Sequence, residues 1–277
     1  MTLAAPALQT AAPTGVTFPR VVRAEWIKFR SVRSTFWTLP ITALVIVALA
    51  VLQAWGMTAF EDTAEVETQA ATIVTGGWIL AQAVVSVLAI LTITGEYSTG
   101  MIRSTLSAVP RRLPALWAKA LVLAVAVAVI SGVAVGLSWL ASLPFLRQLG
   151  LGVDLSAADD LRLLIGTPLY LATIALFALA VGALVRHSAA AIAIVLGMLL
   201  VAEGVVASLP FRVFEVTSPF LPSTAGGRLI VDSPTLQGLN AAGTGPHLTP
   251  WQGYAVLLGW VVVLFAAAAV LLRRRDA

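Results

Sequence analysis

Residues 251–272 read WQGYAVLLGWVVVLFAAAAVLL, without a single charged side chain, and Arg273, Arg274 and Arg275 follow directly. A helix that crosses about 30 Å of hydrocarbon at about 1.5 Å per residue needs roughly 20 apolar residues. Arginines beside such a run are typical of the membrane face toward the cytoplasm. The stretch therefore predicts a transmembrane helix that ends in the cytoplasm.

Five more apolar runs precede this one, and together they determine the predicted fold class. Because a bilayer offers no water to the backbone, each run is expected to be helical. We predict an all-α polytopic membrane protein with six transmembrane helices, although the short fourth and fifth runs could instead form one re-entrant hairpin. The predicted helices are about 36–55, 71–94, 114–140, 166–185, 188–209 and 251–272.

The composition supports a membrane protein and excludes several other classes. Of the 277 residues, 59% are hydrophobic and 11% are charged, whereas a soluble domain is about half apolar and about a quarter charged. Cysteine is absent, which excludes disulfides and thiolate metal sites. The two histidines, His187 and His247, lie far apart in sequence and leave little scope for a histidine metal site.

The basic residues indicate the orientation of the chain. Thirteen of the 17 lie before the first run, between the second and third, between the fourth and fifth, or after the sixth. This bias predicts that both termini are cytoplasmic. Since these residues sit at helix ends and form no basic domain, we expect no nucleic-acid partner. The thirteen are Arg20, Arg23, Lys28, Arg30, Arg33, Arg103, Arg111, Arg112, Lys119, Arg186, Arg273, Arg274 and Arg275.

The N-terminal part of the chain divides in two. Residues 1–19 are rich in Ala, Pro and Thr and predict a disordered segment ahead of a single transmembrane domain over 20–277. Within 20–37, apolar residues recur at helical spacing, which predicts an amphipathic helix in the membrane interface, with Trp26 at headgroup depth. A plain cluster of topogenic charges is the alternative. The apolar stripe contains Val21, Val22, Trp26, Phe29, Val32 and Phe36, and Glu25 and Arg33 intrude on it.

The loop between the second and third runs contains a second possible helix. Residues 98–109 can form a short helix that Pro110 stops. Its apolar residues fall at helical spacing, so it could insert into a groove on a soluble partner, although many inner loops contain such a helix. These apolar residues are Met101, Ile102, Leu106 and Val109.

Two features inside the predicted spans have competing interpretations. Glu203 is the one acid within a span, where a carboxylate costs up to about 3.5 kcal/mol. It is either a substrate-path or gating residue, or a structural group bonded to neighbouring helices. Gly132 and Gly136 could allow close helix packing, or their spacing is chance in a chain rich in Ala and Gly.

Catalysis within this chain is not expected. A nucleotide-binding P-loop needs Gly-Lys followed by Ser or Thr, and the only lysines, Lys28 and Lys119, each follow another residue type. The two histidines are predicted on opposite membrane faces, so neither has the surroundings of a serine-hydrolase base.

Three sequence segments resemble the membrane-spanning permease of type-2 ABC transporters, an exporter family common in bacteria. The likeness extends in topology from Arg20 to Arg275. The segments are EWIKFRS at 25–31 with TFW at 35–37, EYSTG at 96–100 continuing to PRR at 110–112 and Lys119, and LPSTAG at 221–226 in the long outer loop.

This resemblance implies a permease with an interfacial helix, a coupling helix between the second and third spans, and an outer re-entrant region between the fifth and sixth. The implied partners are a cytoplasmic ATP-binding subunit, which carries the ATP and Mg²⁺, a second permease subunit and the lipid bilayer of the bacterial plasma membrane. The resemblance implies ATPase-coupling residues at Glu96, Gly100, Met101, Arg103, Leu106, Pro110, Arg111 and Arg112, and interfacial-helix residues at Glu25, Trp26, Lys28 and Arg30. The possible substrate-path role of Glu203 rests on its place within a span and not on the resemblance.

Two other functions remain open from the sequence. The chain could be an assembly or sensor subunit that transports nothing, or a secondary transporter driven by an ion gradient. A secondary transporter should show broken helices or several charges at the bilayer midplane, and Glu203 alone approaches that description. The spans consist mainly of Val, Ala and Leu, so drugs, antibiotics, lipids and peptides are all possible substrates.

Overall fold

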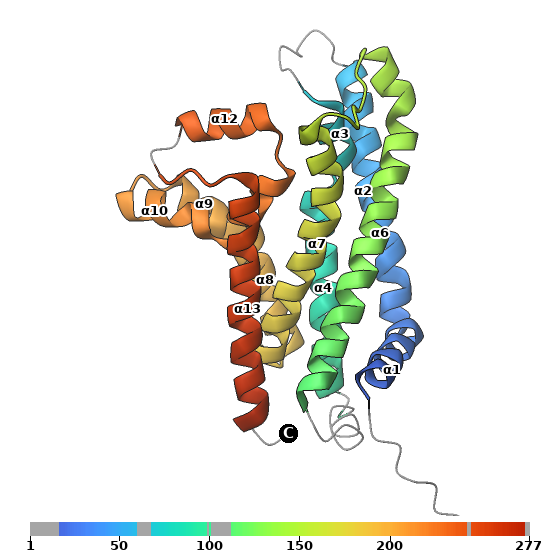
Figure 1. The fold of residues 1–277 in the computed structure, drawn as a ribbon, viewed down its shortest axis with the longest axis vertical. Coiled ribbons are helices and arrows are strands. Elements are labelled where there is room, and N and C mark those ends of the chain that lie inside the picture. The colour runs from blue at the N-terminus through green and yellow to red at the C-terminus, as the bar shows by residue number, and fades with distance from the viewer. Residues whose placement is uncertain (1–16, 60–67, 99, 101–111, 243–244, 275–277) are drawn as a thin grey trace, which may run out of the picture.

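The computed structural model describes residues 17–59, 68–98, 100, 112–242 and 245–274, and these residues form helices and turns without a strand. Figure 1 shows long upright helices with shorter ones at one side. In chain order the long helices and their short neighbours are α1 (Phe18–Ser31), α2 (Arg33–Ala59), α3 (Ala70–Thr75), α4 (Trp78–Ser98), α6 (Arg112–Gln148), α7 (Ala158–Val185), α8 (Ser188–Leu196) and α13 (Pro250–Arg274).

Among the described residues, six helical stretches are long and apolar enough to cross a membrane, which confirms the predicted number. The all-α polytopic fold class is therefore confirmed. The stretches are Thr35–Ala59, Ala70–Ser98, Leu113–Gln148, Ala158–Val185, Ser188–Ser208 and Pro250–Leu272.

The third stretch extends to Gln148 rather than to residue 140, and the fourth stretch also differs from its predicted bounds. It begins at Ala158 rather than at residue 166 and has 28 residues, so it is not one arm of a short re-entrant hairpin. Its first turn contains Asp159 and Asp160, where carboxylates favour the positive end of the helix dipole. These acids and Arg162 interrupt the apolar run in the sequence, although the helix continues through them.

Helix α7 lies at the centre of the bundle and packs against α4, α6 and α13. Most of its buried side chains are apolar, and Tyr170, Leu171, Ile174 and Leu179 are fully enclosed. The turn to α8 is short, as the sequence predicts, with Arg186 in a left-handed conformation at φ 60°. Helices α7 and α8 are therefore direct neighbours.

A glycine allows α4 to approach α2 closely. A Cβ added to Gly77, just before α4, would lie 2.5 Å from the Cα of Ile46 in α2. Two carbon atoms that are not bonded to each other do not approach this closely. By contrast, a Cβ on Gly132 would lie 3.8 Å from Pro168, and one on Gly136 would meet nothing within 4 Å. The close contact between α2 and α4 therefore depends on Gly77, whereas the Gly132 and Gly136 pair allows no comparably close contact.

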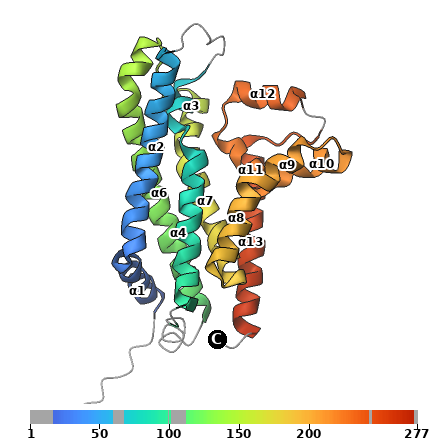
Figure 2. The same cartoon turned by 180° about the vertical axis from the view of Figure 1, so that it is seen from behind.

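The region between the last two spans is largely helical and projects to one side of the bundle (Figures 1 and 2). Its short helices fit the apolar patches that the sequence shows around Phe211, Phe214 and Phe220. The π-helix η2 (Gly197–Ala202) and α9 (Glu203–Ser208) complete the fifth span, and the region beyond it contains α10 (Arg212–Thr217), η3 (Ser218–Phe220), α11 (Pro222–Gly227), η4 (Arg228–Ile230) and α12 (Ser233–Ala242).

The opposite end of the bundle, here named the base, holds α1, the last turn of α4, the first turn of α6 and the C-terminal end of α13 (Figures 1 and 2). Helix α1 lies across this end and packs against α6 and α2. The short projecting helices and α3 lie toward the other end, here named the outer end.

Candidate functional site

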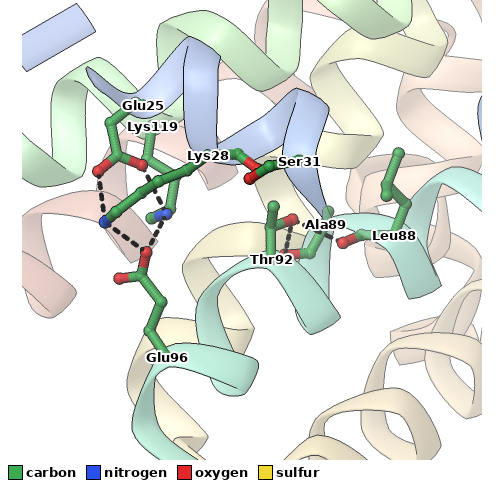
Figure 3. Close-up of polar contacts among 8 residues, drawn as sticks. All are labelled: Glu25, Lys28, Ser31, Leu88, Ala89, Thr92, Glu96 and Lys119. Atoms are coloured by element: carbon green, nitrogen blue, oxygen red, sulfur yellow. Dashed lines mark hydrogen bonds and ion pairs between the residues drawn. The ribbon is translucent and has the colours of Figure 1, made fainter. Parts of the chain in front are cut away.

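Four charged side chains from three helices form a closed ring at the base (Figure 3). Glu25 and Lys28 belong to α1, Glu96 to α4 and Lys119 to α6. The Lys28 Nζ lies 3.0 Å from Glu25 Oε1 and 2.9 Å from Glu96 Oε1. The Lys119 Nζ lies 2.7 Å from Glu25 Oε2 and 2.8 Å from Glu96 Oε1. Each ammonium therefore joins both carboxylates, and the four charges alternate around what we call the charge ring.

The local pattern of α1 places Glu25 in this ring. Val21, Glu25 and Phe29 are the buried residues of the helix, and their spacing of four puts them on one face. Trp26 on the same helix is 42% exposed. The predicted apolar stripe is thus divided between two faces, one against the bundle and one outward. Glu25, which intrudes on that stripe in the sequence, lies at the centre of the buried face.

The charge ring is buried but electrically balanced. The side chains of Glu25, Glu96 and Lys119 are at most 8% exposed, whereas that of Lys28 is 33% exposed. Burial lowers the pKa of Lys28, but the carboxylates of Glu25 and Glu96 outweigh this effect and hold the pKa above its usual value. Lys28 is therefore charged at neutral pH. Removing one member would leave an unpaired buried charge, which is costly in a protein interior.

The charge ring lies beside the predicted coupling segment. Glu96 is two residues from Ser98, the last residue of α4, and α6 begins at Arg112. Gly100 has φ 72°, and its N–H donates to the Tyr97 carbonyl, as expected where a glycine ends a helix. The predicted helix over 98–109 lies almost entirely outside the described residues, as do Met101, Arg103, Leu106, Pro110 and Arg111.

The turn between α7 and α8 also packs against the end of α4. The Arg186 guanidinium lies 5.0 Å from the centre of the Tyr97 ring, within the range of a cation–π contact. The Ser188 hydroxyl donates to Thr94 Oγ1 at 2.8 Å. Four segments of the chain therefore meet at this point: α1, α4, α6 and the turn between α7 and α8.

Glu203 lies far from the charge ring, in the outer part of the molecule. It is 3% exposed and directly follows the π-helix η2. Its carboxylate accepts the N–H groups of Ser223 and Thr224 at 2.9 and 2.6 Å, and the Thr224 hydroxyl at 2.8 Å. These groups belong to the first turn of α11, whose free N–H groups favour an anion. Glu203 therefore joins α9 to α11.

Tyr170, which no sequence pattern indicated, also binds the first turn of α11. The Tyr170 hydroxyl lies 2.7 Å from Gln82 Oε1 and 3.0 Å from Ser223 Oγ. The three residues come from α7, α4 and α11. A polar Tyr or Gln in an apolar span was the only available signal, and it gave no indication of the partner.

Arginine and aspartate on α7 bind the outer region as well. Arg162 donates to the carbonyls of Arg228, Leu229 and Val231 and pairs with Asp159. Asp159 also accepts the backbone N–H and the hydroxyl of Ser233, at 3.0 and 2.7 Å. These contacts satisfy carbonyls at the end of η4 and attach this part of the outer region to the bundle.

A cavity of about 570 Å³ lies beside Glu203. Its walls are mainly apolar, with carboxylates at Glu203 and Glu215, a guanidinium at Arg228 and an imidazole at His247. The Arg228 guanidinium is already hydrogen-bonded to Asn240 and to the Leu248 carbonyl. Within the described part of the chain, no three His, Asp or Glu side chains come together as a metal site.

Comparison with known proteins identifies the family. A family model described as "ABC-2 family transporter protein" matches residues 21–204. The match begins in α1 and ends just after Glu203, so it includes all four members of the charge ring. A search of curated proteins gave no match. Because the family model covers well over half of the chain, this six-span membrane protein belongs to the ABC-2 transporter family.

Proposed function

We propose that the chain is the permease subunit of an ATP-driven exporter in a bacterial plasma membrane. It forms the transport path and binds no nucleotide itself. A separate cytoplasmic subunit binds and hydrolyses ATP with Mg²⁺, and a second permease subunit, identical or related, completes the transporter. The observation that carries this proposal is the family match over 21–204, because proteins of this family are generally non-enzymatic membrane components that work with ATP-binding subunits.

The distribution of charge supports a cytoplasmic base. Arg273 and Arg274 at the end of α13, the basic residues of α1, and Arg186 all belong to segments at this end. Acids such as Asp154, Asp159 and Asp232 belong to segments at the outer end. An excess of Lys and Arg is characteristic of cytoplasmic loops.

The segment 99–111 is the proposed contact with the ATP-binding subunit. It connects α4 to α6 at the base, and Glu96 and Lys119 join these two helices at 2.8 Å. Of its apolar residues Met101, Ile102, Leu106 and Val109, the last three recur at spacings of four and three, as in helices that insert into a groove on a partner. Movement of the partner would reach α4 and α6 through this segment.

Substitutions on the apolar side of this segment test the proposal. Met101→Asp and Leu106→Asp introduce a charge where an apolar groove is expected, so they should abolish co-purification of a cytoplasmic ATP-binding-cassette protein. The measurement is affinity purification of the tagged full chain from membranes in mild detergent. The amount of chain in the membrane should not change.

Leu155→Asp and Val213→Asp are matched controls, because both side chains are more than half exposed and belong to the outer end. These variants should retain the ATP-binding protein. If Met101→Asp and Leu106→Asp retain it as well, segment 99–111 is not the contact. If the unchanged chain purifies without such a protein, an assembly or sensor subunit becomes the better description.

A further inference from the structure

Both lysines of this 277-residue chain are members of the charge ring. Every other basic residue is an arginine. An ammonium is a compact charge with three donors that can point in different directions. Lys119 uses this geometry to join Glu25 of α1 to Glu96 of α4, with distances of 2.7 and 2.8 Å.

The charge ring joins α1 to the two helices that border segment 99–111, α4 and α6. Glu96 lies in the last turn of α4, just before the segment, and Lys119 lies two turns into α6, just after it. Glu25 and Lys28 add α1, which otherwise contacts the bundle through apolar residues such as Val21 and Phe29. The positions of both ends of the segment are therefore coupled to the position of α1.

Stability alone is a weak reason for such a ring. The cost of removing four charges from water offsets much of their attraction, so buried ion pairs often contribute little net stability. The main helix contacts, α2 with α6 and α4 with α7, are supplied by apolar side chains. Alternating charges instead favour one relative position of α1, α4 and α6. If one of these helices shifted against the others, like charges would come together.

We propose that the charge ring of Glu25, Lys28, Glu96 and Lys119 is a positioning device. It fixes α1 to α4 and α6, the helices on either side of segment 99–111, and so presents that segment to the ATP-binding subunit in one geometry. This inference rests on the proposed function for the identity of the partner. It gives α1 a role in coupling in addition to its place in the membrane interface.

The experiment compares Glu96→Gln, Lys119→Met and the double variant in the full chain. Each single variant leaves one buried charge in excess, whereas the double variant is neutral and retains the Glu25 and Lys28 pair. Each single variant should therefore bind the ATP-binding subunit about tenfold more weakly, and the double variant should recover much of this loss, as interacting residues do in a double-mutant cycle. Asp159→Asn is the matched control, because it breaks an ion pair at the outer end and should leave the affinity unchanged.

Hydrogen–deuterium exchange of the permease alone gives a second readout that requires no partner. Exchange in 18–31 and 99–111 should rise in each single variant and return toward the original level in the double variant. Exchange that is unchanged in the single variants, or a double variant no better than they are, would overturn the positioning role. If the unchanged chain binds no ATP-binding subunit, the proposed function fails, and exchange still decides whether the charge ring positions these helices.

A charge exchange distinguishes a ring from a simple pair. Glu96→Lys combined with Lys119→Glu preserves the pair between α4 and α6, but it places like charges at 28 and 96 and at 25 and 119. We expect this variant to behave like the single variants in both readouts. Normal affinity and normal exchange would show that α1 takes no part.

Discussion

At the scale of single residues, the buried charged side chains Glu25, Glu96, Lys119 and Glu203 each contact a charged or polar group from another segment of the chain. Glu203 has no ion-pair partner among the described contacts and instead accepts two N–H groups and a hydroxyl from α11. These three hydrogen bonds all come from the outer region. This geometry favours the structural interpretation of Glu203 over that of a substrate-path residue, because both carboxylate oxygens are already engaged.

Glu203→Ala tests this interpretation. The variant leaves the N–H groups of Ser223 and Thr224 without their buried acceptor, which costs about 1–3 kcal/mol for each unsatisfied group. We expect a lower melting temperature and faster proteolysis between residues 209 and 249, while the ATP-binding subunit still co-purifies.

The control is His247→Ala, which removes an exposed polar side chain beside the same cavity and should change the melting temperature little. If Glu203→Ala leaves both stability and proteolysis unchanged but stops transport, the substrate-path interpretation is correct.

Sequence reasoning found the important residues more readily than their partners. It placed Glu25 on a mainly apolar helical stripe and Glu96 at the start of the inner loop. In the structure, Lys119 forms an ion pair with each of these two carboxylates. Glu25 and Lys119 are 94 positions apart, and no local pattern connects them. The partner of a buried charge depends on tertiary packing, which a single sequence does not reveal.

At the scale of helices, apolar length predicted the six spans, and charge obscured their ends. The fourth span appeared short because Asp159, Asp160 and Arg162 interrupt its hydrophobic run. In the structure, Arg162 binds three carbonyls of the outer region and Asp159 binds Ser233. The helix therefore extends to Ala158, because its polar first turns are satisfied by a segment far away in sequence.

Close packing of helices was also difficult to predict from spacing. The Gly132 and Gly136 pair follows the small-residue pattern. The backbones of α2 and α4 nevertheless come close at Gly77. Nothing in the sequence around Gly77 indicates which helix lies opposite. The position of α2 against this glycine depends on the arrangement of the whole bundle.

Gly77→Ala should separate α4 from α2. The new Cβ would lie 2.5 Å from Ile46 Cα, and because backbone cannot move aside cheaply, we expect a loss of about 1–3 kcal/mol. Thermal unfolding of the purified chain in detergent measures this loss.

Gly56→Ala in α2 is the control, since its Cβ would meet nothing within 4 Å and alanine favours a helix over glycine. It should leave the melting temperature unchanged or raise it slightly. Equal effects of the two substitutions would show that α2 and α4 do not pack as described.

At the scale of the whole molecule, the two ends of the bundle have different chemistry. The base contains the charge ring, α1, the arginine-rich C-terminal end and the helices that border segment 99–111. The outer end contains the helices that Glu203, Tyr170 and Arg162 attach to the bundle, together with the cavity beside Glu203. This division fits a permease driven from the basic side, and the sequence predicted it through the distribution of Lys and Arg.

The most direct test is to determine which side of the membrane each end faces. The chain has no cysteine, so Ser104→Cys in the coupling segment and Ser156→Cys at the outer end each introduce one reactive thiol. With a membrane-impermeant maleimide added to intact cells, we predict labelling of Ser156→Cys and labelling of Ser104→Cys only after the membrane is opened. Labelling of Ser104→Cys in intact cells would contradict the account, because an ATP-binding subunit in the cytoplasm could not reach that segment.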